Sequence, residues 1–198
     1  MTLVRTFIGV HLNAAVRDRI EALANELRRR PGGQAARWTP KGNIHLTLKF
    51  LGDVESGGLP AVYEAVAQAV VALPPFAVQV ANLGCFPNAR RPNIVWAGLG
   101  GELGALRALQ QAIEGALEPL GHPREARAFS PHLTIARANR RASAAESAAL
   151  GQTIAAYGPV ALGQIAVASV SVIKSDLRPT GPIYTDLSQA PLEGRSDV

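Results

Sequence analysis

The sequence predicts one domain of the α+β or α/β class built from two similar halves, because strand-like and helical segments alternate along its 198 residues. The order strand, helix, strand, helix, strand occurs twice. The motif His-Leu-Thr-(Leu/Ile) also occurs twice, at residues 45–48 and 132–135. The motif histidines are 132 − 45 = 87 residues apart, and the strands that open the halves, centred on Phe7 and Trp96, are 96 − 7 = 89 apart. This agreement indicates an internal duplication of about residues 3–83 and 93–174.

The first half begins with a strand at residues 3–12, which are rich in Val, Ile, Phe and Thr. Asn13 can cap a helix that runs to about residue 30, where Pro31-Gly32-Gly33 ends it. The other expected elements of this half are the first motif strand at 44–51, a helix at 59–73 and a strand at 76–83.

The second half repeats the pattern. Its expected elements are a strand at 93–99, a helix at 102–120, the second motif strand at 131–137, a helix at 144–157 and strands within 160–174. A Pro/Gly-rich return follows at 176–184. We therefore expect a single domain at residues 1–187 and a flexible tail at 188–198.

Composition restricts the class of protein. A net charge of +5 favours an anionic partner such as RNA or a phosphate ester. Cys85 is the only cysteine, so no disulfide within the chain and no cysteine metal cluster is expected. The N-terminus does not resemble a signal peptide, and no run of about 18 apolar residues predicts a membrane span. We expect a soluble, cytoplasmic protein.

The two motifs predict a site for acid–base chemistry. Alternation along a strand puts His45 and Thr47 on one face and the leucines on the other, and it does the same for His132 and Thr134. Two imidazoles can supply one general base and one general acid near neutral pH. In-line displacement at phosphorus needs this pair, and the hydroxyls can bind the phosphate oxygens.

Other interpretations compete with this one. A single such histidine is more often structural, but two copies in a duplicated chain favour function. A two-histidine metal site lacks a third ligand at convincing spacing. His11 and His122 lie outside the repeated motif and are expected at the surface or rim.

At these residues the chain resembles the 2H phosphoesterase superfamily, and within it the bacterial and archaeal RNA 2′,3′-cyclic phosphodiesterases, historically called 2′-5′ RNA ligases. The resemblance covers nearly the whole chain up to about residue 187. It is carried by the doubled motif and by residues 5–10, 38–52, 84–98, 129–137 and 179–184.

The resemblance implies an α+β fold with two lobes related by a pseudo-two-fold axis, each with an antiparallel sheet and helices, around a central cleft. It implies metal-independent hydrolysis of a terminal 2′,3′-cyclic phosphate on RNA, or on a small cyclic nucleotide, to a 2′-phosphate. No cofactor is implied. Because both histidines belong to one chain, a monomer is sufficient. Weak 2′-5′ joining of RNA would be the reverse reaction, which dilute water disfavours.

The resemblance also divides the roles that the symmetric motif leaves open. It implies that His45 is the proton donor and His132 the proton acceptor, that Thr47 and Thr134 bind phosphate, and that Arg137 binds substrate. Strict alternation puts Arg137 on the wrong face, so its strand must end or bend. Lys49 is in register with His45 and is a candidate for the rim. Core packing competes with base stacking for Phe7, Trp38 and Phe129. A binding module without turnover is the rival class of function.

Overall fold

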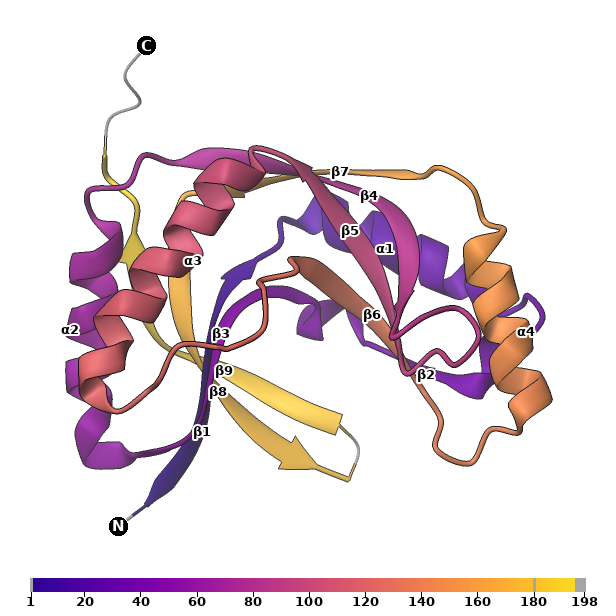
Figure 1. The fold of residues 1–198 in the computed structure, drawn as a ribbon, viewed down its shortest axis with the longest axis horizontal. Coiled ribbons are helices and arrows are strands. Elements are labelled where there is room, and N and C mark those ends of the chain that lie inside the picture. The colour runs from indigo at the N-terminus through magenta and orange to yellow at the C-terminus, as the bar shows by residue number, and fades with distance from the viewer. Residues whose placement is uncertain (1, 180, 195–198) are drawn as a thin grey trace.

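The computed structural model describes residues 2–179 and 181–194. Within them, nine strands form one curled antiparallel sheet that carries four α-helices (Figure 1). The strands are β1 (Leu3–His11), β2 (Ala36–Trp38), β3 (His45–Glu55), β4 (Phe76–Phe86), β5 (Ile94–Gly101), β6 (His132–Ala138), β7 (Ala161–Val167), β8 (Ser169–Arg178) and β9 (Gly181–Pro191). The helices are α1 (Ala14–Leu27), α2 (Leu59–Val70), α3 (Leu103–Leu117) and α4 (Ala144–Ala155). No helix in this part of the chain is both long and apolar enough to cross a membrane.

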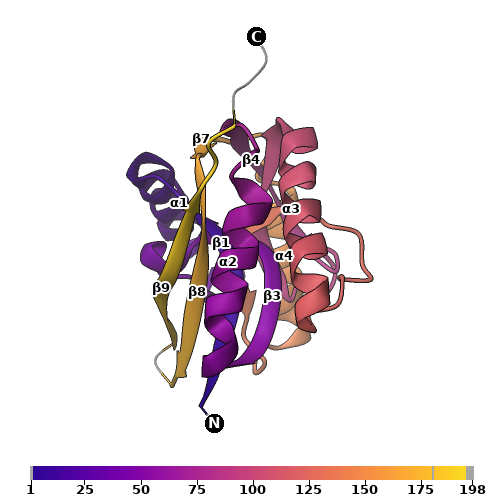
Figure 2. The same cartoon turned by 90° about the vertical axis from the view of Figure 1, so that its left-hand side faces the viewer.

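The sheet divides symmetrically at its centre. Its order is β7-β4-β5-β6-β3-β1-β8-β9, and the central strands β3 and β6 pair at Leu46 and Leu133 alone. We call β3, β1, β8 and β9 with α2 and α3 the first lobe, and β6, β5, β4 and β7 with α1 and α4 the second lobe. Figure 2, seen from the side of the first lobe, shows α2 beside β8 and β9, with α3 on the other side of α2. The predicted α+β class with two lobes is confirmed.

The lobes do not coincide with the sequence repeats. β4 belongs to the first repeat but pairs with β5 in the second lobe, and β8 belongs to the second repeat but pairs with β1 in the first lobe. Helices exchange as well, because α1 packs against β7 and α3 packs against β3. Each lobe is therefore made from both repeats, a swap that the repeated order of elements does not reveal.

The C-terminal segment corrects the predicted tail. β9 continues through Pro191, and the side chains of Ala190 and Leu192 are buried. The backbone N–H groups of Glu193 and Gly194 donate to the carbonyls of Val71 and Leu73 after α2. The tail prediction was wrong for residues 188–194, because a strand and a docked segment with few apolar side chains look like a frayed end. Residues 195–198 of that prediction lie outside the described part of the chain.

The cap predicted at the start of α1 is confirmed. The Asn13 side chain accepts a hydrogen bond of 2.9 Å from the N–H of Val16 and caps α1. Ser143 and Glu146 form a capping box at α4. α1 buries Val16, Ile20 and Leu27 against the sheet, which fixes the helix that the apolar spacing predicted.

Candidate active site

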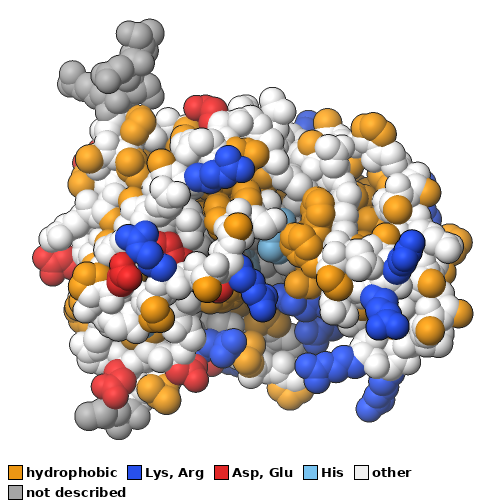
Figure 3. Space-filling view, viewed as in Figure 1, with side chains coloured by type: hydrophobic (Ala, Val, Ile, Leu, Met, Phe, Trp, Pro, Cys, Tyr) orange, Lys and Arg blue, Asp and Glu red, His pale blue; other side chains and the backbone are white. Residues whose placement is uncertain are grey.

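The two motif strands lie next to each other at the centre of the sheet. Leu46 and Leu133 are completely buried in the core, while the histidines and threonines beside them are half-buried on the opposite face. The pairing of Leu46 with Leu133 is antiparallel, so His45 lies toward Thr134 and His132 lies toward Thr47. Figure 3 shows histidine atoms in the recess between the two lobes. The expected face with two imidazoles and two hydroxyls is present.

Both histidines are oriented in the same way. His45 Nδ1 lies 2.9 Å from the carbonyl oxygen of Asn43, and His132 Nδ1 lies 2.8 Å from that of Ser130. A carbonyl can only accept, so Nδ1 carries a proton in each ring. In the neutral imidazole Nε2 is then the basic nitrogen, and in the imidazolium it is the second acid. The same bond to residue i − 2 therefore leaves Nε2 of each histidine for chemistry.

His45 is enclosed by aromatic rings. Phe7 of β1 stacks on it with ring centroids 4.5 Å apart, and Tyr184 of β9 meets it edge-on at 5.1 Å. Burial lowers the pKa of His45 to about 4, and the positive charges of His11 and Arg137 act in the same direction. The protein without a bound ligand therefore holds His45 neutral at pH 7.

His132 has a different neighbourhood in the second lobe. Phe86 of β4 meets its ring edge-on at 5.0 Å, and Phe86 in turn lies 5.3 Å from Trp96. Trp96 is the cross-strand partner of Thr134, and a Cβ on Gly84 would lie 2.1 Å from its indole. Gly84 thus lets the indole lie flat across β4 next to the second motif.

Each motif strand has a β-bulge, and the bulge in β6 explains the position of Arg137. In β6, Val95 pairs with Ala136 while Trp96 pairs with Thr134, so Ile135 and Ala136 together take one place in the ladder. Both are completely buried, and Arg137 returns to the face of His132 and Thr134. Its charge lowers the pKa of His45 and acts on Tyr184 in the same direction, which places the guanidinium near the first motif. The predicted bend exists.

The matching bulge in β3 overturns the rim position expected for Lys49. The register shifts between Ile8–Lys49 and Gly9–Thr47, so both Leu48 and Lys49 face the core. Lys49 forms a buried ion pair with Glu114 of α3 and donates to the carbonyl of Pro123 at 2.8 Å. Glu114 also accepts from Gln110 at 3.0 Å. Lys49 ties α3 and the loop before β6 to the first motif strand.

Three aromatic residues of the site were not predicted. Phe50, one residue beyond the bulge, is 69% exposed on the face of His45, with its ring 5.9 Å from Phe7. Tyr184 and Phe86 come from β9 and β4 and contact the two histidines. Of the predicted stacking candidates, Phe7 and Trp38 are buried, and the Trp38 indole donates to the carbonyl of Gly33. Phe129 is partly buried against the core.

The remaining histidines lie outside the two motifs, although His11 of β1 is the cross-strand partner of His45. His11 Nε2 is 2.8 Å from Asp186 at the surface, and burial lowers the pKa of His122 in its loop. Among the described residues, no three His, Cys, Asp or Glu side chains are grouped as metal ligands.

Comparison with known proteins assigns the family. The family model "LigT like Phosphoesterase" matches residues 10–96 and 101–184. An RNA 2′,3′-cyclic phosphodiesterase of Methanothermobacter thermautotrophicus is 31% identical, over 93% of this chain and 96% of the relative. A protein of the same name from Archaeoglobus fulgidus is 30% identical, over 93% and 98%.

Solved structures give the same result for the fold. The protein TT0787 of Thermus thermophilus superposes with a TM-score of 0.80 at 27% identity, covering 97% of this chain and all of that one. E. coli LigT in complex with 3′-AMP superposes with a TM-score of 0.75 at 23% identity, covering 96% and 99%. Together with the doubled His-x-Thr strands and the full-length match to the family model, these likenesses show that the chain belongs to the LigT-like branch of the 2H phosphoesterases.

Proposed function

We propose that this protein hydrolyses the 2′,3′-cyclic phosphate at the end of an RNA to a 2′-phosphate. The observation that supports this best is the pair of motif histidines, each with Nδ1 bonded to a carbonyl and Nε2 left for proton transfer at the centre of one sheet. The names of the relatives, RNA 2′,3′-cyclic phosphodiesterases, supply the substrate.

In the proposed reaction, one Nε2 takes a proton from water as the water oxygen attacks phosphorus. The bond from phosphorus to O3′ breaks, and the other histidine gives a proton to O3′. The products are a 3′-hydroxyl and a 2′-phosphate. Thr47 and Thr134 donate hydrogen bonds to the non-bridging oxygens, and Arg137 neutralises the charge that develops there. Phe50 offers an exposed ring for the terminal base.

The roles of the histidines need an additional argument. We assign the donor role to His45 and the acceptor role to His132, as in the family that the motifs resemble. A pKa of about 4 in the free enzyme opposes a donor role, because His45 is then neutral at pH 7. The cyclic phosphate carries a negative charge, and its binding next to the imidazole raises that pKa. On this proposal His45 becomes protonated when substrate binds.

Both histidines belong to one chain, so a monomer is sufficient for turnover. Joining of a 2′,3′-cyclic end to a 5′-hydroxyl would use the same groups in reverse, with the 5′-hydroxyl in place of water. Hydrolysis dominates in dilute solution because water is in large excess.

Hydrolysis of a nucleoside 2′,3′-cyclic phosphate in the presence of EDTA tests the function. We expect wild-type protein to give the 2′-phosphate, and His45→Gln and His132→Gln to lose about 10²–10⁴-fold in kcat. His122→Gln, in the loop between α3 and β6, is the matched control and keeps wild-type activity. Equal rates for all four proteins, or a 3′-phosphate product, would contradict the proposal.

An aryl phosphodiester tests the division of roles, because p-nitrophenolate leaves without a proton. We expect His45→Gln to recover most of its activity on this substrate and His132→Gln to remain inactive. The opposite pattern would exchange the roles of the two histidines and leave the hydrolytic function intact.

A further inference from the structure

Arginines extend from the motif face along one edge of the second lobe. Arg37 of β2 is the cross-strand partner of Arg137 in β6. Directly opposite residues of an antiparallel pair share a face, so both guanidinium groups project from the face of His132. Two like charges opposite each other destabilise a sheet. In the part of the chain that the structure describes, neither arginine has an acidic partner in ion-pair range.

Two more arginines follow Arg137 along the chain. β6 ends at Ala138, and the N–H of Ala142 donates to the carbonyl of Asn139 at 3.0 Å, which closes a turn. Arg140 and Arg141 occupy the two central positions of this turn and are exposed. They too lack an acidic partner among the described residues. We call Arg37, Arg137, Arg140 and Arg141 the arginine strip.

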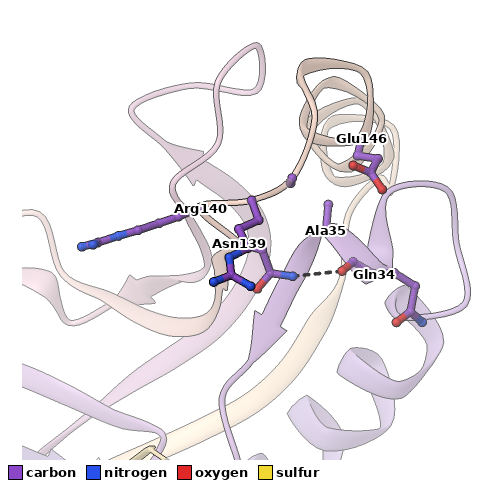
Figure 4. Close-up of a pocket in the computed structure, with 7 residues that line it drawn as sticks. Gln34, Ala35, Asn139, Arg140 and Glu146 are labelled. Carbon is purple, nitrogen blue, oxygen red and sulfur yellow. Dashed lines mark hydrogen bonds between the residues drawn. The ribbon is translucent and has the colours of Figure 1, made fainter. Parts of the chain in front are cut away.

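The backbone under the strip is firmly held. The N–H of Asn139 donates to the carbonyl of Ala35 at 2.7 Å, and its side-chain amide donates to the carbonyl of Gln34 at 3.1 Å. These groups line a surface pocket of about 460 Å³ together with Arg140, Arg141 and Glu146 (Figure 4). The Glu146 carboxylate is engaged by the N–H and hydroxyl of Ser143 at 2.8 and 2.7 Å, so it does not pair with the arginines.

The first lobe has the opposite charge at the equivalent place. Eight residues after the motif histidine stands Asp53 in β3 (53 − 45 = 8) and Arg140 after β6 (140 − 132 = 8). Glu55 ends β3, whereas Arg141 follows β6. In Figure 3 the acidic side chains on this face lie over the first lobe, among some Lys and Arg, whereas the charged side chains seen over the second lobe are Lys and Arg. Asp53 is the cross-strand partner of Arg5, whereas the arginine strip has no such acidic partner among the described residues, so a polyanion that enters the cleft is attracted more strongly to the second lobe.

We propose that the arginine strip binds the phosphates of the RNA strand that leads to the cyclic end. This inference rests on the proposed function and specifies its substrate as an RNA chain, in preference to a free cyclic nucleotide. Arg137 lies at the terminal phosphate, Arg37 opposite it, and Arg140 and Arg141 in the turn after β6, at most about 10–13 Å farther along the chain at about 3.3 Å per residue. The strip sets the direction in which the strand leaves the cleft.

The test compares two substrates that share the same reactive end. One is a nucleoside 2′,3′-cyclic phosphate, and the other is a six-nucleotide RNA that ends in the same group. We expect wild-type protein to have a kcat/KM at least 10-fold higher for the RNA at low salt. Arg140→Gln/Arg141→Gln should lose most of this preference and keep the kcat/KM of the mononucleotide within about 2-fold. It should also flatten the slope of log kcat/KM against log salt for the RNA by about 1.4, the value for two lost contacts to single strands.

Arg29→Gln/Arg107→Gln is the matched control, because it removes the same charge from exposed positions at the end of α1 and on α3. It should behave like the wild type on both substrates. No preference for RNA in the wild type, or an unchanged preference in Arg140→Gln/Arg141→Gln, would overturn the inference.

Binding of a fluorescent six-nucleotide RNA with a 3′-phosphate separates this inference from the function itself. If wild-type protein binds this RNA at least 5-fold more tightly than Arg140→Gln/Arg141→Gln but hydrolyses neither substrate, the strip stands and the proposed function fails. If hydrolysis is normal and the two proteins bind the RNA equally, the function stands and the strip fails.

Discussion

The motif strands β3 and β6 begin alike and continue differently. Both open with His-Leu-Thr, both bond the histidine Nδ1 to the carbonyl two residues before, and both have a bulge after the threonine. Beyond the threonine, β3 supplies a buried Lys49 and an exposed Phe50, whereas β6 supplies a buried Ala136 and an exposed Arg137. A cyclic phosphate has distinct 2′ and 3′ oxygens, so a symmetric pair of histidines needs asymmetric neighbours to distinguish them.

Removing the buried charge of Lys49 on β3 should have the largest effect, and this effect is on stability. We expect Lys49→Met to lower the free energy of unfolding by about 3–5 kcal/mol, because Glu114 is left buried and unpaired. Urea unfolding at pH 7.5 measures this.

The double variant Lys49→Met/Glu114→Leu should recover most of that loss, since it removes both charges. Lys41→Met, which breaks an exposed pair with Asp18 and Glu21, is the control and should leave the free energy of unfolding nearly unchanged. If Lys49→Met and Lys41→Met were equally stable, Lys49 would not hold the strand to α3.

Substitutions at the two exposed positions after the bulges, Arg137 and Phe50, should have the next largest effects. Arg137→Gln should lower kcat/KM for a cyclic mononucleotide about 10–100-fold, the range for a lost hydrogen bond to a charged group. Phe50→Ala should lower it about 5–10-fold through KM, because stacking on a base acts in binding. Steady-state kinetics separates the two effects. A larger loss for Phe50→Ala than for Arg137→Gln would show that the base, and not the phosphate, dominates recognition.

The last expected effect concerns the pH dependence of stability and leaves the fold intact. An imidazole in the unfolded chain titrates near pH 6.5, but burial lowers the pKa of His45 to about 4. Between these values the unfolded state binds more protons, so stability rises with pH through the window and is lost as pH falls from about 6.5 to 4. For this one group the difference between pH 7.5 and pH 5 is on the order of 2 kcal/mol.

His45→Gln should remove that contribution from the pH dependence of urea unfolding. His132→Gln, at the equivalent position of the second lobe, should keep it. The same pH dependence in wild type and His45→Gln would mean that water reaches His45 despite the rings of Phe7 and Tyr184.

The sequence was sufficient to predict which motif residues share a face, but not where the motif strands bulge. The motif alternation placed His45, Thr47, His132 and Thr134 on one face because each leucine and isoleucine needs the core. The Asn13 cap was predictable because capping depends on neighbours in sequence. The predicted ends of helices α2, α3 and α4 lie within about three residues of the observed ends. At the end of α3 the difference is a short 3-10 turn.

The predictions that were wrong concern features fixed by contacts between residues distant in sequence. A bulge is fixed by the partner strand, so Lys49 was placed on the wrong face and Arg137 could not be placed on the right one. Tyr184 contacts His45 through a hairpin more than a hundred residues away, and its segment looked like a loop because of its Pro and Gly. The exchange of β4 and β8 between the lobes leaves no trace in local composition.

That exchange has a consequence for how the chain folds as it is made. β1 leaves the ribosome well before its neighbour β8, which comes 174 − 6 = 168 residues later, counted at the pair Thr6–Lys174. The second lobe also needs β7, so neither lobe can close its sheet until β7 and β8 have been synthesised. Pairing over such separations is slow and exposes unpaired strand edges in the meantime. We therefore expect the nascent protein to depend on whatever shields β1 and β3 during that interval.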